Sequence, residues 1–222
     1  MGDAYSRAAD GSKIHVVDGV STNWVIGWKG AYASVAPDLR TLRFKPLIVN
    51  AGIYGVNDKA VCFGHRPKHK VPGNLCRCGF NAWDNDDLAM RYIGMYHESD
   101  IRNMQSIGTM PRYGWLRSMV LLRVGMHGDV IEGTLDAGKG WDKWGYRASD
   151  QRVADVFFDD CCAACGAKAK YLCAMSKEHV HSDALLPLRS FCAQHSRYGQ
   201  YVLQKASLSE RNHVDIHWGP PS

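Results

Sequence analysis

The first 55 residues alternate short apolar clusters with turn residues. Three clusters, at residues 13–17, 23–28 and 46–55, are rich in β-branched and aromatic side chains, which favours strands. The charged and Pro-containing stretches between them, residues 36–40 and 43–46, predict loops. The N-terminal part of the chain is therefore predicted to be rich in β-structure.

The spacing of apolar residues changes in the middle of the chain. Leu88, Tyr92 and Met95 recur at helical spacing, and Asp84 stands where an N-cap is expected. These positions predict one helix over residues 86–98. A stretch that contains Gly and Pro follows and ends the helical pattern.

After the helix the pattern returns to strands. Residues 118–133 predict a strand pair with a turn at residues 126–129, and residues 137–149 predict a loop rich in Gly and Trp. A further apolar run covers residues 152–158, and a last strand is expected within residues 211–222. These elements predict an α+β fold, with a mainly antiparallel sheet and one principal helix.

Composition shifts at Asp159, where a short cysteine-rich segment begins. This shift predicts two domains: a mixed α+β domain over residues 1–158 and a zinc-knuckle module over residues 159–222. A module of this length buries little core, so loss of its metal is expected to unfold it.

The overall composition is that of a folded soluble protein. The chain has 222 residues, of which 45% are hydrophobic and 22% are charged, and its net charge is +5. That charge permits an anionic partner without requiring one. The chain contains neither a signal-peptide pattern nor a run of membrane-spanning length, so we expect a cytoplasmic protein. Structural disulfides are rare in that compartment, which favours metal ligands or free thiols.

Two paired half-sites in the C-terminal module predict a zinc centre. Cys162 and Cys165 have C-x2-C spacing, and Gly166 follows them, where a tight turn needs a residue that tolerates positive φ. Cys192 and His195 form a C-x2-H half-site, which 26 residues separate from the first half-site. Together they give a Cys3His tetrahedron, a common structural zinc set.

Cys161 is an alternative to Cys162 in this site, although it would give the less favourable C-x3-C spacing. A thioredoxin-like redox pair at Cys162 and Cys165 is a further alternative, but no βαβ pattern surrounds these residues. With Cys162 as ligand, Cys161 and Cys173 are expected to be small apolar residues.

A second zinc site is predicted earlier in the chain. Cys62 and His65 form a C-x2-H half-site, and Cys76 and Cys78 form a C-x-C half-site that is followed by glycine. His69 is an alternative to His65, and the intervening basic stretch can also be read as a solvated loop. With four protein ligands each, both predicted zinc ions would be structural, because no position stays open for water or substrate.

The segment between the C-terminal half-sites resembles the zinc hairpin of His-Asn-His nucleases. Glu178, His179 and the apolar Phe191 match that arrangement. The central asparagine position is Pro187, and the later catalytic histidine position is Ser196. The resemblance therefore implies a degenerate hairpin without catalysis, and no other catalytic motif is present.

A basic and aromatic stretch is a candidate surface for nucleic acid, although tryptophans are more often core residues. Its candidate contact residues are Lys139, Trp141, Lys143, Trp144 and Arg147.

Several motifs together resemble a group of uncharacterised actinobacterial and actinophage proteins. That group has a Trp-containing N-terminal strand, a Cys followed by a His, a Cys-x-Cys-Gly-aromatic-x-Ala motif, a helix and a hairpin ending in Gly-x-Arg-Ala. The matching pieces are Trp24, Cys62, residues 76–82, residues 128–133 and residues 145–148. The resemblance implies a phage or actinobacterial source, with the host cytoplasm as the compartment if the protein is phage-encoded.

These features predict a non-enzymatic binding protein stabilised by two structural zinc ions. A phage-type or host regulatory factor that engages a protein partner is the first expectation. A nucleic-acid-binding protein and a degenerate His-Asn-His-type nuclease are the alternatives.

Overall fold

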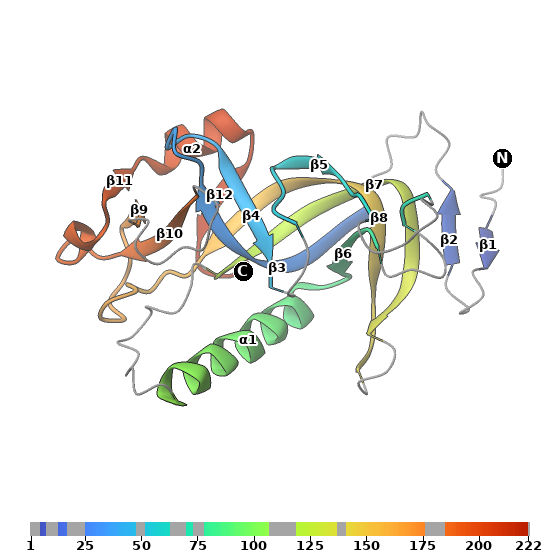
Figure 1. Cartoon of the computed structure of the whole chain (residues 1–222), viewed down its shortest axis with the longest axis horizontal. Coiled ribbons are helices and arrows are strands. Elements are labelled where there is room, and N and C mark those ends of the chain that lie inside the picture. The colour runs from blue at the N-terminus through green and yellow to red at the C-terminus, as the bar shows by residue number, and fades with distance from the viewer. Residues whose placement is uncertain are drawn as a thin grey trace. The chain divides into compact units, whose positions relative to one another are not determined.

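The computed structural model (Figure 1) describes residues 5–7, 13–16, 25–47, 52–62, 70–72, 78–106, 119–136, 141–175 and 185–221. The chain divides into two compact units. Unit 1 comprises residues 1–29, 57–89 and 123–153, and unit 2 comprises residues 30–56, 90–122 and 154–222. The stretch predicted as a separate module, residues 159–222, lies in unit 2, and its boundary stays a prediction.

Unit 1 is built from antiparallel strands. They are β1 (Tyr5–Arg7), β2 (Lys13–Val16), β5 (Asn57–Lys59), β6 (Phe80–Trp83), and parts of β3 (Val25–Val35), β7 (Met119–Asp136) and β8 (Trp141–Phe158). The strand order is β1-β2-β7-β8-β6-β3, and β5 also pairs with β8. Buried Val124, Met126, Val130 and Val153 contribute to its core.

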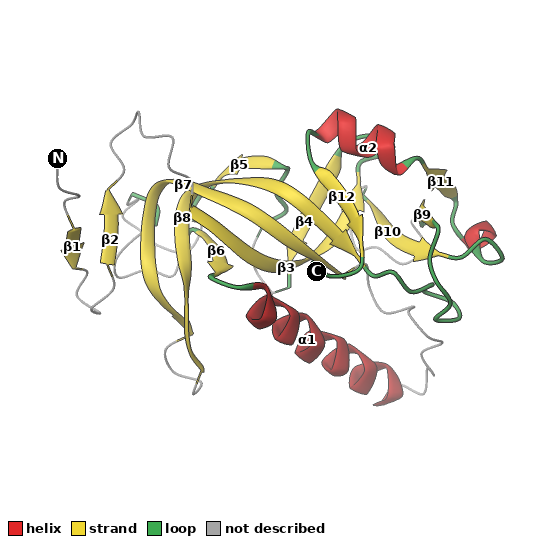
Figure 2. Ribbon diagram, turned by 180° about the vertical axis from the view of Figure 1, so that it is seen from behind, coloured by secondary structure: helices red, strands yellow, loops and turns green. Residues whose placement is uncertain are grey.

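Unit 2 combines strands with helices. Its strands are β4 (Leu42–Pro46), β9 (Tyr171–Ala174), β10 (Leu186–Phe191), β11 (Tyr201–Leu203) and β12 (Asp215–Trp218), with the remainder of β3, β7 and β8. The order β3-β10-β9-β11 is antiparallel, whereas β12 runs parallel to the end of β8. Its helices are most of α1 (Asp86–Ser106), the 3₁₀-helix η2 (Ser196–Tyr198) and α2 (Lys205–Asn212), which connects β11 to β12 (Figure 2).

The predicted α+β class and the mainly antiparallel sheet are confirmed. The strand predictions at residues 13–17 and 23–28 and in the C-terminal tail are also confirmed. The described chain has α2 in addition to the single principal helix that was predicted. None of the helices in the described ranges is both long and apolar enough to cross a membrane.

The predicted loop at residues 43–46 is wrong, because these residues belong to β4. Leu42 and Phe44 are fully buried, and the charged residues between and after them face outward, so the alternation is that of a half-buried strand. The preceding turn is confirmed: the carboxylate of Asp38 accepts hydrogen bonds from the backbone N–H groups of Arg40 and Thr41, at 2.8 and 3.0 Å. Of the strand predicted over residues 46–55, Pro46 belongs to β4 and the described residues 52–55 form no strand, although Tyr54 makes an isolated bridge to Phe44.

The predicted strand pair at residues 118–133 is one continuous strand, β7. Gly128 has a φ of +75°, which explains its turn-like sequence, yet β7 continues past it and pairs with β2 at residues 129–132. A Cβ atom at Gly128 would lie 2.2 Å from Ser149 Oγ, so only glycine allows this approach. Likewise, β8 begins at Trp141, inside the stretch predicted to be a loop.

The helix prediction is correct in position but short. α1 extends to Ser106 rather than ending near residue 98. Its N-cap is Asn85 rather than Asp84, because Asn85 Oδ1 accepts the backbone N–H of Leu88 at 2.9 Å. Asp84 instead accepts a hydrogen bond from the Asn85 side chain, at 2.9 Å.

Candidate metal centre

The first half-site is a tight turn that follows β8. The backbone N–H of Gly166 donates to the carbonyl of Cys162 at 2.9 Å, and Gly166 has a φ of +73°, as its position after the C-x2-C pair predicted. The backbone N–H of Ala164 points at Cys162 Sγ, at 3.4 Å. The turn therefore presents both cysteines on one side and directs N–H groups at a sulfur.

The second half-site is a matching turn at the end of β10. The backbone N–H groups of His195 and Ser196 donate to the carbonyl of Cys192, at 3.1 and 3.0 Å. The chain then enters η2, whose Tyr198 stacks on the His195 ring with 5.2 Å between the ring centroids. This stacking restricts the orientation of the imidazole.

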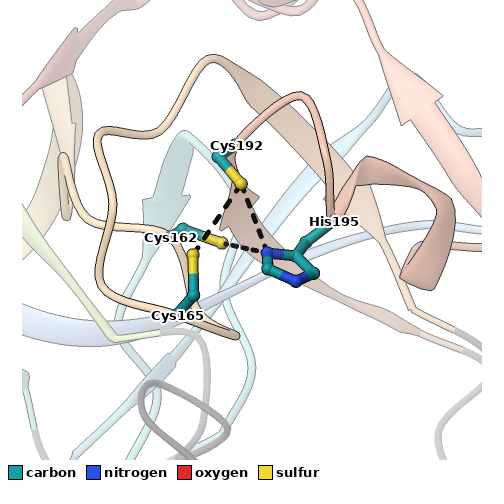
Figure 3. A group of neighbouring side chains, drawn as sticks. All are labelled: Cys162, Cys165, Cys192 and His195. Atoms are coloured by element: carbon teal, nitrogen blue, oxygen red, sulfur yellow. Dashed lines mark hydrogen bonds between the residues drawn. The ribbon is translucent and has the colours of Figure 1, made fainter.

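The two turns bring four ligand atoms together (Figure 3). The sulfurs of Cys162, Cys165 and Cys192 and a ring nitrogen of His195 all lie within 4.8 Å of one another. Cys165 Sγ lies 3.8 Å from Cys192 Sγ, and His195 Nδ1 lies 3.6 Å from Cys162 Sγ. Nδ1 is also 3.3 Å from Cys192 Sγ. This cluster, predicted from the spacing, could hold a metal ion.

The surroundings of Cys162 favour its thiolate form. Burial alone would raise the pKa of this thiol, but backbone N–H groups, including those of Ala164 and Cys192, point at the sulfur and lower its pKa to about 6. A metal ligand must be a thiolate, so this backbone arrangement prepares the site for a cation.

The structure also decides between the two adjacent cysteines. Cys162 belongs to the cluster, whereas Cys161 is exposed and its Sγ lies 3.6 Å from Asp160 Oδ1. Desolvation and the neighbouring carboxylates of Asp159 and Asp160 raise the pKa of the Cys161 thiol to about 11. Cys161 was expected to be a small apolar residue; its thiol stays neutral, and its side chain is exposed because the chain leaves β8 there.

Cys173 is buried, as expected, and forms part of the support for the metal centre. Cys162, Ala163, Cys173 and Phe191 make one buried cluster. Burial, together with the nearby Cys162 sulfur, raises the pKa of the Cys173 thiol to about 11, so it stays a neutral apolar group. The sequence did not identify Phe191 or Tyr198 as supports of the centre, although Phe191 directly precedes Cys192 and Tyr198 follows His195 by three residues.

Close packing over Cys173 gives a stability prediction. A Cβ at Gly199 would lie 2.3 Å from Cys173 Cβ, whereas a Cβ at Gly94 on α1 has no neighbour within 4 Å. Gly199→Ala should lower the free energy of unfolding by about 2 kcal/mol or more, since overpacking costs about 1–3 kcal/mol. The matched change Gly94→Ala should raise it by about 0.5–1 kcal/mol, as alanine favours a helix interior. Urea denaturation of both variants tests this prediction, and equal effects would contradict it.

The other predicted site residues are described only in part. Of the second predicted zinc site, Cys62 and Cys78 are both partly buried residues of unit 1. Their predicted partners His65 and Cys76, and the alternative His69, lie outside the described residues. That site stays a prediction from spacing.

The candidate nucleic-acid stretch is also only partly described. β8 contains Trp141, Lys143 and Trp144, but the side chains of these three residues lie outside the described part of the structure. The whole of Lys139 lies outside it. Arg147 is partly buried and pairs with Asn81 of β6.

The residues of the nuclease resemblance do not assemble into a described site. Glu178 and His179 lie outside the described residues. Pro187 lies in β10 opposite Ser34, and the hydroxyl of Ser196 donates to the carbonyl of Ala193 at 3.1 Å. Both residues that replace the nuclease's catalytic groups therefore have local structural contacts.

No family model, no curated protein and no solved structure matches this chain.

Proposed function

We propose that this is a non-enzymatic binding protein whose Cys3His cluster holds a structural zinc ion. A single observation carries the proposal: four ligand atoms from two turns converge within 4.8 Å. With Zn–S near 2.3 Å and Zn–N near 2.0–2.1 Å, a tetrahedron has edges of about 3.8 Å between sulfurs and about 3.6 Å between sulfur and nitrogen. The separations of 3.8 Å between Cys165 and Cys192 and 3.6 Å between Cys162 and His195 agree with these edges, whereas Cys192 Sγ and His195 Nδ1, at 3.3 Å, are closer than the ideal edge.

The ligand types favour zinc over other metals. Three thiolates and one imidazole are a soft set, which suits zinc in tetrahedral geometry, whereas magnesium and calcium prefer oxygen ligands. Four protein ligands complete the coordination, so no position stays open for a water that could be activated. The proposed ion therefore stabilises the fold and does not take part in a reaction.

The ion would connect two turns that are distant in the sequence. The turn at Cys162–Gly166 follows β8, and the turn at Cys192–His195 follows β10. The backbone N–H of Ala163, in the first turn, donates a hydrogen bond to the carbonyl of Ser190, just before the second, at 2.8 Å. Metal binding would fix both turns and the loop that continues into η2, because metal affinity and local folding are coupled.

Metal analysis tests this proposal. Protein purified without chelator should contain at least one zinc ion per chain, and two if the predicted Cys62 site also forms. Cys192→Ser should lower the content by one ion, because it removes a ligand that no neighbouring thiol replaces. The matched variant Cys161→Ser should leave the content unchanged. Zinc-free protein that is nevertheless folded would contradict the proposal.

The sequence suggested a protein partner first and nucleic acid second. We propose the same order for this protein, with a protein partner first and nucleic acid as the alternative.

A further inference from the structure

A groove in unit 2 lies beside the first ligand turn of the metal centre. Its volume is about 510 Å³, which is in the range of ligand-binding pockets, and its described lining residues all belong to unit 2. Its helical wall consists of Met90, Ile93, Gly94 and His97, which are spaced so that they share one face of α1. Met90, Gly94 and His97 are exposed, so the groove opens to solvent. We call this cavity the α1 groove.

Apolar residues form most of the other walls of the α1 groove. Leu121 near the start of β7, Phe158 at the end of β8 and Leu188 of β10 all line it and are buried. Met90 of α1 is 39% exposed, and methionine is a side chain that adapts its shape to a partner. The α1 groove therefore suits a large apolar side chain that enters from solvent.

Gly94 leaves bare backbone in the middle of the helical wall. Glycine in a helix interior is less stable than alanine, so a structural or functional need usually accounts for it. At Gly30 of β3 that need is evident, since a Cβ there would lie 2.6 Å from Ile93 Cγ1. A Cβ at Gly94 would meet no described atom within 4 Å, so the described chain does not itself require glycine there. Glycine at this position would let the backbone of a partner approach α1 closely.

Two exposed carboxylates, Asp159 and Asp160, line the α1 groove where the chain leaves β8. Asp159 Oδ1 accepts the backbone N–H of Cys161 at 2.9 Å, and Asp160 Oδ1 lies 3.6 Å from the Cys161 sulfur. Neither carboxylate forms an ion pair with a residue that the structure describes. The described lining also includes His97 and one cation, Arg189, but the Nε and Nη1 atoms of Arg189 are buried. The carboxylates are therefore the more accessible charges of the groove.

We propose that the α1 groove binds a protein segment that carries a large apolar side chain next to a Lys or Arg. The proposal rests on the proposed function, because Cys162 and Gly166 line the groove and the metal would fix the turn that contains them. The apolar side chain would fill the groove, and the cation would pair with Asp159 or Asp160. The bare backbone at Gly94 and the open side of the groove favour a polypeptide over a small molecule, which is usually enclosed by its pocket. The two carboxylates would repel the phosphates of a nucleic acid.

Selection from a display library of random dodecapeptides, with zinc-loaded, full-length protein as the target, tests the chemistry of the partner. Enriched peptides should carry Lys or Arg within about four residues of a Leu, Ile, Phe or Trp. The most enriched peptide is then labelled, and its Kd is measured by fluorescence anisotropy at several salt concentrations.

Two leucine substitutions on α1 test the groove itself. Gly94→Leu places a side chain in the groove at a position with free space, and leucine favours a helix, so the fold should be retained. It should weaken peptide binding about tenfold or more. The matched change Ser99→Leu, at an exposed position on the opposite face of α1, should alter binding less than about twofold.

Two double variants test the charges. Asp159→Asn with Asp160→Asn keeps the acceptor oxygens but removes both charges, so it should weaken binding about fivefold and flatten its salt dependence. Glu210→Gln with Asp215→Asn removes two exposed charges outside the described lining of the groove. This matched change should alter binding less than about twofold.

Zinc content is measured on every sample, which separates two kinds of failure. Protein without zinc would contradict the proposed function. Zinc-loaded protein that enriches no peptide would overturn only the inference about the α1 groove. Enriched peptides without a cation, or equal losses in the groove variants and their matched controls, would also overturn it. A single-stranded dT probe that binds more tightly than every enriched peptide and displaces them would assign the groove to nucleic acid instead.

Discussion

Replacing Cys162 with serine should abolish metal binding at the Cys3His cluster and unfold the two ligand turns. Cys162 is buried, its sulfur accepts the N–H of Ala164, and it contacts Cys173 and Phe191 within one buried cluster. Without the metal, the remaining ligand side chains have no ion to hold the turns together. We expect the free energy of unfolding to fall by about 3 kcal/mol or more, because metal-binding energy at such sites is folding energy.

Hydrogen exchange shows how far this unfolding spreads. The sequence predicted that the whole stretch after Asp159 would unfold, because a short module buries little core. The structure limits this expectation, since β10 pairs with β3 and the side chains of Leu172 and Leu188 are fully buried or nearly so. We therefore expect loss of protection in the ligand turns and in β11, with protection retained in the β3–β4 hairpin.

Cys161→Ser is the matched control, since it alters an exposed thiol one residue away that lies outside the Cys3His cluster. It should leave both the metal content and the exchange pattern unchanged. Retained protection at Cys192–Tyr198 in Cys162→Ser would show that packing alone holds the turns, and the structural role of the metal would then be wrong.

Raising the pH from 7.5 to 9.5 should stabilise the wild-type protein relative to Lys29→Met by about 2.5 kcal/mol. Lys29 is 8% exposed, and its Nζ donates to Gln151 Oε1 at 3.0 Å and lies 5.3 Å from the centre of the Phe80 ring. Burial lowers the pKa of this ammonium from 10.5 to about 7. The unfolded chain then binds more protons than the folded protein between pH 7 and about 10.5, so stability rises with pH in that range.

The free energy of unfolding changes by about 1.4 kcal/mol per pH unit for each additional proton that the unfolded chain binds. This rate and the difference in proton binding give the size of the effect. Urea denaturation at pH 7.5, 8.5 and 9.5 measures it, and Lys29→Met should lack this component of the slope because methionine does not titrate. The exposed Lys59, changed to Met, is the control and should leave the slope unchanged. Parallel slopes for wild type and Lys29→Met would show that Lys29 is not neutral in the folded protein.

The ligand set in the C-terminal half was predictable because metal ligation depends on local spacing. Two residues between cysteines, followed by glycine, allow one short turn, and the structure forms that turn with Gly166 at positive φ. The same reasoning located α1, whose apolar residues recur over several turns. In both cases the information lies within a few consecutive residues.

The tertiary structure decided what depends on residues distant in the sequence. Cys161 and Cys162 are neighbours with the same side chain, and only the path of the chain after β8 places Cys162 in the cluster and Cys161 in solvent. β4 has too many charged residues to be recognised alone, and it forms because β3 offers a partner strand.

The sequence does not indicate that Lys29 is buried, because lysine is usually exposed and its burial results from packing near Gln151, 122 positions away. Nor does it indicate that Tyr171 and Tyr198 both neighbour Phe191, since strand pairing places Tyr171 opposite Phe191 and the Tyr198 ring meets the Phe191 ring edge-on. Spacing along the chain thus indicated which residues can bind a metal. Burial and cross-strand register, which arise from distant segments, determined which of those residues come together and which side chains surround them.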